Sequence, residues 1–132
     1  MRSRPSAKWC SVIGDDRLEV RRGGLYWVNW SPGRGSEQAG VRPALVVQTD
    51  PANRSKSYPN TIVLAVSTVG RGIYTHVALD PSPDNGLAKL SYVKCEQLLT
   101  ISKSRLQGRL GQLSDAEMAQ VTEALRLVLG MA

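Results

Sequence analysis

The side chains best suited to chemistry lie between Gly33 and Gln48, in the segment GRGSEQAGVRPALVVQ. Three glycines, a Ser-Glu-Gln triplet and Arg42 are followed by Pro43 and then by an apolar run that must be buried. Binding and catalytic groups are commonly held on loops that are anchored in a core strand. Because proline disfavours the helical region for the residue before it, we expect Arg42 to have an extended backbone where the core begins.

The chain of 132 residues has a formal net charge of +6 and a pI near 9.7. This balance favours anionic partners, such as nucleic acid or an acidic protein segment. Residues 1–22 hold six of the basic residues and three of the acidic ones, so the remainder is only mildly basic. The length predicts a single domain, small enough for dimerisation to help it.

Several classes of protein are disfavoured by what the chain lacks. Cys10 and Cys95 are too few for a disulfide framework, and no Cys/His spacing suggests a zinc site, so we expect neither metal nor cofactor. No apolar run approaches the roughly 18 residues of a membrane span, and the N-terminus lacks the apolar centre of a signal peptide. We therefore expect a soluble, cytoplasmic protein.

Short apolar runs bounded by turn residues predict the elements that position these side chains. The predicted strands are Leu25–Trp30, Ala44–Gln48, Thr61–Val66, Tyr74–Leu79 and Leu90–Ile101. Residues 49–60 hold two prolines and two asparagines and predict a long surface loop, and residues 80–86 predict a turn. Such a series of short strands indicates a small, strongly bent sheet or barrel.

The two ends of the chain differ from this pattern. Residues 1–20 predict an N-terminal extension, either disordered or pinned to the body by Trp9, Val12 and Ile13, ahead of a domain over residues 21–132. Ser114 and Glu117 form a capping-box pattern that predicts the start of a C-terminal helix. An apolar stripe, which belongs to the core or to a dimer contact, recurs at helical spacing: Met118, Val121, Leu125, Val128 and Leu129. Gly130 predicts the end of the helix.

A family resemblance is carried by six segments in the same order: RRGGLYWVNW, GRGSEQAGVRPALVVQ, TIVLAVST, THV, VKCEQLLTI and RLGQLSDAEMAQVTEALRLVLG. From residue 21 to the end, the chain resembles the MazF/PemK family of toxin endoribonucleases. The resemblance implies a mainly β fold, an SH3-like small β-barrel of the CcdB/MazF type with a C-terminal α-helix. It also implies a homodimer, sequence-specific and metal-independent cleavage of single-stranded mRNA, inhibition of translation and growth, and neutralisation by a cognate MazE-type antitoxin.

In a ribonuclease that works without metal, the 2′-hydroxyl of the substrate attacks the phosphate, giving a 2′,3′-cyclic phosphate or 3′-phosphate and a 5′-hydroxyl. The protein must then supply positive charge, a proton donor and a proton acceptor. By resemblance, Arg42 matches the family's catalytic arginine, and Thr68 matches the threonine that contacts the scissile phosphate, with Ser67 able to replace it. Glu37 is a candidate base and Glu96 is another, so the identity of the base stays open.

Other polar residues are placed to line the RNA-binding groove, since single strands are read by hydrogen bonds and by base stacking. These residues are Arg34, Ser36, Gln38, Ser67, Lys94, Glu96 and Gln97. We expect a structural role for His76. Trp30 and Tyr58, beside the loops, are candidates for stacking, although core packing is the favoured role for Trp27 and Trp30.

Two alternatives stay open beside the ribonuclease. The same barrel is used by poisons of DNA gyrase, which cleave nothing, and a homologue could bind RNA after losing its catalysis. The GSEQAGVRP motif and Thr68 favour the ribonuclease. The recognised RNA sequence depends on loop conformations within residues 31–42, 49–60 and 69–74.

Overall fold

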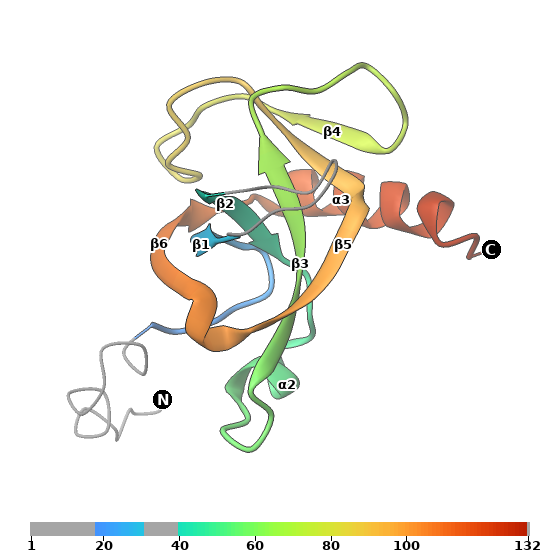
Figure 1. The fold of residues 1–132 in the computed structure, drawn as a ribbon. Helices are drawn as coiled ribbons and strands as arrows, with labels where there is room; N and C mark the ends of the chain where they lie inside the picture. The colour runs from blue at the N-terminus through green and yellow to red at the C-terminus, as the bar shows by residue number, and fades with distance from the viewer. Residues whose placement is uncertain (1–17, 31–39, 132) are drawn as a thin grey trace.

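The structure, a computed structural model, describes residues 18–30 and 40–131. Figure 1 shows the elements in these ranges, and three of them are helical: α2 (Asp50–Arg54), the 3₁₀ helix η2 (Lys103–Arg105) and α3 (Asp115–Val128). The strands are β1 (Gly24–Asn29), β2 (Val41–Val46), β3 (Asn60–Ser67), β4 (His76–Leu79), β5 (Ser91–Ser102) and β6 (Leu106–Gln112).

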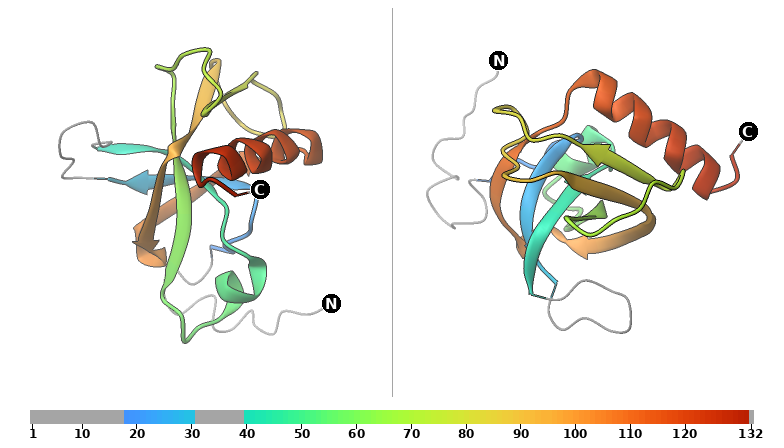
Figure 2. Two further views of the ribbon diagram at one scale, coloured as in Figure 1. Left: turned by 90° about the vertical axis from the view of Figure 1, so that its right-hand side faces the viewer. Right: turned by 90° about the horizontal axis from the view of Figure 1, so that it is seen from above.

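The strands form one six-stranded antiparallel sheet with the order β4-β5-β3-β2-β1-β6. β1 pairs with β6, so the first and last of these strands are hydrogen-bonded neighbours. The sheet is strongly bent, and α3 lies along one side of it, against β4 and β5 (Figure 2). The predicted mainly β fold with a C-terminal helix is thus confirmed.

The central strands send alternate side chains into two apolar clusters on opposite faces of the sheet. Leu25 and Leu45 belong to the cluster that α3 covers. The next residues in sequence, Tyr26 and Val46, belong to the other cluster. Successive side chains of a strand point to opposite faces. Because both faces are buried here, the strands have nearly continuous apolar sequences and do not alternate with polar residues.

Helix α3 begins with the predicted capping box. The Glu117 N–H donates to Ser114 Oγ at 3.1 Å, and the Ser114 N–H donates to Glu117 Oε1 at 2.8 Å. Gly130 follows the helix with a φ of +68°, a conformation that glycine adopts without strain. The predicted apolar stripe contacts the core through every member except Leu129, which is 54% exposed.

The prolines and asparagines of residues 49–60 predicted a long surface loop. The structure differs, because this segment also contains the short helix α2. Pro51 stands in the first turn of α2, where no backbone N–H is needed. The buried Asn53 connects the helix to the sheet: its Nδ2 donates to the Gln48 carbonyl at 2.8 Å, and its Oδ1 accepts from Thr61 Oγ1 at 2.9 Å. Tertiary hydrogen bonds, which no local pattern reveals, therefore support this short helix.

Strand β6 is absent from the prediction because its sequence, LQGRLGQ, contains two glycines and three long polar residues. Its pairing with β1 makes it a strand, with register shifts that accommodate irregular geometry.

Strand β2 begins at Val41, before the predicted start at Ala44, so Arg42 lies on a strand and not in the loop. Pro43 is tolerated because β3 pairs with β2 only from Ala44 onward, so no hydrogen bond to β3 is lost at the proline.

Candidate functional site

A cleft of about 260 Å³ lies beside Arg42. Its walls come from β1, β2, the end of β3, the loop that precedes β5, and β6. We call it the Arg42 cleft. It is lined by Trp27, Val41, Arg42, Pro43, Val66, Ser67, Thr68, Gly86, Leu87, Ala88, Lys89, Ser91 and Leu110.

The register of the sheet brings Arg42 close to the two predicted hydroxyl groups. Arg42 is opposite Val28 of β1, and Ala44 is opposite Ala65 of β3. Because β2 and β3 are antiparallel, the start of β2 and the end of β3 lie at the same end of the sheet. Arg42, Ser67 and Thr68 therefore line one cleft, as their proposed roles require.

The two hydroxyl groups differ in how they are held. Ser67 Oγ accepts a hydrogen bond from the Val69 N–H at 3.0 Å, which fixes the oxygen and leaves its proton able to donate. Thr68 is exposed, and its side chain makes no hydrogen bond with any residue that the structure describes. Ser67 is therefore the better positioned of the two donors.

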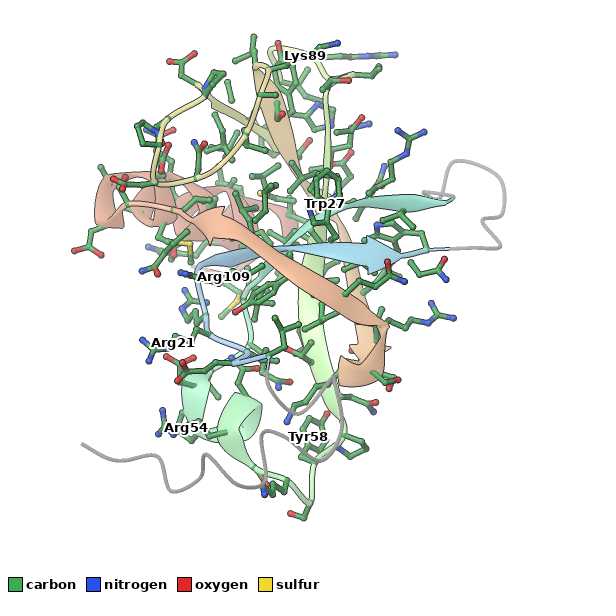
Figure 3. All side chains as sticks on the ribbon, turned by 90° about the vertical axis from the view of Figure 1, so that its left-hand side faces the viewer. Arg21, Trp27, Arg54, Tyr58, Lys89 and Arg109 are labelled. Carbon is green, nitrogen blue, oxygen red and sulfur yellow. The ribbon has the colours of Figure 1, made fainter. Side chains whose placement is uncertain are left out.

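Trp27 lines the Arg42 cleft and is 39% exposed, so the expectation of core packing is wrong for this residue. Leu25 and Trp27 lie on one face of β1, but the α3-covered cluster includes Leu25 and not Trp27. Trp27 is opposite Pro43 (Figure 3 labels it), at the end of β2 that β3 does not pair. The polar Asn29 two positions further on is the sequence signal for an open face. Trp30 is 5% exposed, as expected for the core.

Lys89 also lines the Arg42 cleft, and sequence reasoning did not identify it. A single lysine in a turn-rich segment carries no pattern. Only its position next to Arg42 in space makes it a candidate.

A second cavity, of about 330 Å³, lies where the chain continues past Thr68. We call it the His76 cavity. Its lining consists of Val69, Gly70, Arg71, Ile73, His76, Lys94 and Glu96.

His76 connects the loop before β4 to β5. Its Nδ1 accepts from the Arg71 backbone N–H at 3.1 Å, so in the neutral ring Nε2 carries the proton and donates to Glu96 Oε2 at 2.9 Å. The His76 side chain is 7% exposed. These contacts give His76 the structural role that its strand-like sequence suggested.

Glu96 is held in its ionised form. Burial acts to raise its pKa, but the hydrogen bond from His76, together with a backbone hydrogen bond and the charge of His76, outweighs burial and lowers the pKa below its usual value. A carboxylate with a lowered pKa that already accepts a hydrogen bond is a poor proton acceptor. The geometry therefore disfavours Glu96 as the base.

A bulge in β5 separates the remaining predicted RNA-binding residues. Ala65 is opposite Lys94, but Leu64 is opposite Leu98, so residues 95–97 have no partner on β3. Lys94 and Glu96 line the His76 cavity, whereas Gln97 lines neither that cavity nor the Arg42 cleft.

Cys95, inside this bulge, is buried, and burial raises the pKa of its thiol to about 11. The side chain is therefore a core residue and not a nucleophile.

Four predicted residues, Arg34, Ser36, Glu37 and Gln38, lie outside the described residues. Within residues 18–30 and 40–131, no three His, Cys, Asp or Glu side chains gather to hold a metal ion. No helix in these ranges is long and apolar enough to cross a membrane.

Comparison with known proteins identifies the class. Residues 21–129 match the family described as PemK-like, MazF-like toxin of type II toxin-antitoxin system. The chain is 39% identical over 116 residues to "Endoribonuclease MazF" of Staphylococcus saprophyticus, covering 85% of this chain and 92% of that protein. The chain therefore belongs to the PemK/MazF family of toxins, as its sequence motifs predicted.

Solved structures agree with this assignment. MazF from Deinococcus radiodurans is 27% identical, with a TM-score of 0.72 over 86% of this chain and 99% of that chain. A mycobacterial endoribonuclease in complex with its cognate antitoxin is 28% identical, with a TM-score of 0.71 over 86% of this chain and 97% of that chain. The fold is thus MazF-like.

Proposed function

We propose that this protein is an endoribonuclease toxin that cleaves single-stranded mRNA at short sequences and thereby inhibits translation. The proposal is supported by its family and by its 39% identity to a protein named as an endoribonuclease. The observation that carries it is the Arg42 cleft, where an arginine, two hydroxyl groups and an exposed tryptophan line one surface.

Each of these groups suits a step of RNA cleavage by the substrate's own 2′-hydroxyl. A guanidinium can bind two phosphate oxygens and stabilise the charge that develops on them. Ser67 and Thr68 donate hydrogen bonds to the same phosphate, and Trp27 offers a face on which a base can stack. The 2′-hydroxyl loses its proton as its oxygen forms a bond to phosphorus. The bond from phosphorus to the 5′-oxygen breaks, and the 5′-oxygen takes up a proton, which balances the one lost by the 2′-hydroxyl.

The group that accepts the 2′ proton is a separate question. Glu37 and Glu96 are the candidate carboxylates, and the hydrogen bond between His76 and Glu96 makes Glu37 the better candidate. Since the nucleophile belongs to the substrate, the proposed reaction needs no metal ion.

The test is to incubate the purified protein with a mixed RNA in EDTA and to map the cut ends. We expect a 2′,3′-cyclic phosphate or 3′-phosphate on one fragment and a 5′-hydroxyl on the other. A single 2′-deoxy substitution 5′ to the scissile phosphate should stop cleavage while binding persists. Metal-dependent cleavage that leaves a 5′-phosphate would overturn this chemistry. Binding without cleavage would indicate an inactive homologue, and gyrase inhibition without cleavage would indicate a gyrase poison.

Neutralisation by a cognate antitoxin is the second part of the proposal. The net charge of +6, and exposed apolar residues such as Val41 and Trp27 beside Arg42, suit an acidic segment that folds on contact and covers the cleft. The mycobacterial complex with a cognate antitoxin and the MazE-MazF complex of Deinococcus radiodurans, 27% identical with a TM-score of 0.69, support it. An antitoxin complex that leaves Arg42 accessible and cleavage unaffected would contradict it.

We place the protein in the cytoplasm, where mRNA is translated.

We also propose residues 1–20 as an extension to the toxin domain. The last residues of this segment contact the body, because Val20 is buried and the Tyr26 hydroxyl donates to the Glu19 carbonyl at 2.6 Å.

A further inference from the structure

We infer that Lys89 is a second phosphate-binding residue, which holds a phosphate of the RNA next to the scissile one. The inference rests on the proposed function. Lys89 and Arg42 line the same cleft, and no carboxylate is among the described residues that line it. Lys89, whose own side chain makes no ion pair with any described residue, is a second cation beside Arg42, and this arrangement suits a polyanion that presents one phosphate after another.

The backbone that carries Lys89 is fixed by a buried asparagine. Asn85 is 0% exposed, and its Oδ1 accepts from the N–H groups of Ser82 at 3.0 Å and Leu87 at 2.9 Å. Its Nδ2 donates to the Asp80 carbonyl at 2.8 Å. Both polar atoms of this side chain thus hold the loop in one conformation.

The same loop is docked on β6. Gly86 has a φ of +71°, and a Cβ at this position would lie 2.1 Å from the Leu110 carbonyl oxygen. A Cβ on Gly111 would lie 2.3 Å from the Asn85 backbone, and the Gln112 N–H donates to the Asp84 carbonyl at 2.9 Å. The loop and strand are therefore in contact through their backbones, which leaves little room for movement.

Lys89 has a backbone that is fixed by a hydrogen bond and a side chain that is exposed to solvent. The Ser91 hydroxyl donates to the Lys89 carbonyl at 2.9 Å. The Lys89 side chain is exposed, and its ammonium makes no hydrogen bond or ion pair with any described residue. A lysine acts as a point charge on a flexible stem, so it can follow a phosphate without the fixed geometry that Arg42 imposes.

The test measures binding separately from cleavage. The probe is a fluorescent single-stranded RNA that spans the mapped cleavage site and carries a 2′-deoxy ribose 5′ to the scissile phosphate. If the wild-type protein cleaves nothing, a mixed-sequence 2′-O-methyl RNA takes its place, so failure of the proposed function leaves this test intact. The control is Arg54→Ala, because Arg54 is an exposed cation on α2 at the opposite end of the molecule from Lys89 (Figure 3).

We expect Lys89→Ala to raise the Kd about threefold to tenfold and to reduce the slope of log Kd against log salt by about 0.7, the value for one phosphate contact in a single strand. KM should rise in parallel while kcat falls less than about twofold. Lys89→Arg should keep the wild-type slope. An unchanged slope, equal to that of Arg54→Ala, would overturn the inference, and so would a loss confined to kcat.

Discussion

Arg42 has an exposed side chain on a strand whose following residues are fully buried. Its guanidinium is thus outside the core, while its backbone is held by the pairing of β2 with β1. A residue in this position can serve the reaction without serving stability, so the two effects of a substitution separate.

Arg42→Ala should therefore lower cleavage about a hundredfold to a thousandfold, the usual loss when one donor to a transition-state anion is removed. Circular dichroism and the urea-unfolding midpoint should stay near wild type, because no core contact is lost. Cleavage of the mapped RNA in a single-turnover assay gives the rate, with Arg54→Ala as the control for lost charge. A near wild-type rate would contradict the assignment of Arg42.

Substitution by alanine can show which of Ser67 and Thr68 contributes more to the rate of cleavage. Ser67 Oγ is held by the Val69 N–H, whereas Thr68 is exposed. On this geometry we expect Ser67→Ala to lower the single-turnover rate more than Thr68→Ala, although Thr68 is the residue that matches the family motif. The reverse order would show that the family match outweighs the geometry seen in the free protein.

At this scale the sequence predicted part of the candidate site. Arg42, Ser67 and Thr68 were found through motifs, and the structure brings them together. Trp27 and Lys89 could not be found in that way. Their role depends on where the α3-covered cluster stops and on how a loop docks onto β6, and both are properties of tertiary packing.

At the scale of elements, the loop between β3 and β4 depends on the contacts of His76. Because the folded-state pKa of Glu96 is below the ordinary value of 4.5, ionised Glu96 stabilises the fold above that pH. This contribution is lost as the pH falls through the lower, folded-state pKa.

The measurement is the free energy of unfolding in urea from about pH 7 to about pH 3, for the wild type and for Glu96→Gln. The advantage of the wild type should disappear across the acid end of this range. Since Glu96 is exposed, solvent screening keeps the effect small. A constant difference between the two curves would contradict the prediction.

The loop that carries Lys89 offers a second test with a matched control. Gly86→Ala should lower the free energy of unfolding by about 1–3 kcal/mol, because the new methyl group would collide with the Leu110 carbonyl oxygen and because φ is positive at this position. Gly72→Ala should change the stability by less than about 0.5 kcal/mol, since a Cβ at Gly72 has no atom within 4 Å. Equal urea midpoints for the two variants would show that the loop adapts.

Among the elements, the most regular patterns predicted best. The predicted strand Leu90–Ile101 and the observed strand β5, Ser91–Ser102, differ by one residue at each end. The capping box correctly predicted the start of α3. Helix α2 and strand β6 were missed because each is held by partners distant in sequence. Asn53 supports the first, and pairing with β1 forms the second.

For the whole molecule, we expect a homodimer. Beside the two cavities lie large apolar side chains that are exposed in the single chain: Val41, Val69, Ile73, Tyr74 and Leu90. Burying such residues in an isologous contact would join two clefts into one longer groove. Light scattering at micromolar concentration should give twice the 14.4 kDa of one chain. A mass of one chain at that concentration would count against the dimer.

The pairing of β1 with β6 also determines at which stage of translation the Arg42 cleft can form. Trp27 is opposite Gly108, and contacts so distant in sequence form late, because the chain between them must first lose its freedom. A nascent chain that ends before β6 has an unpaired β1 and no surface on which the loop around Gly86 can dock. We therefore expect the Arg42 cleft to form only after the last strand has left the ribosome. Under the proposed function, a partly made chain would then be unable to cleave the message that encodes it.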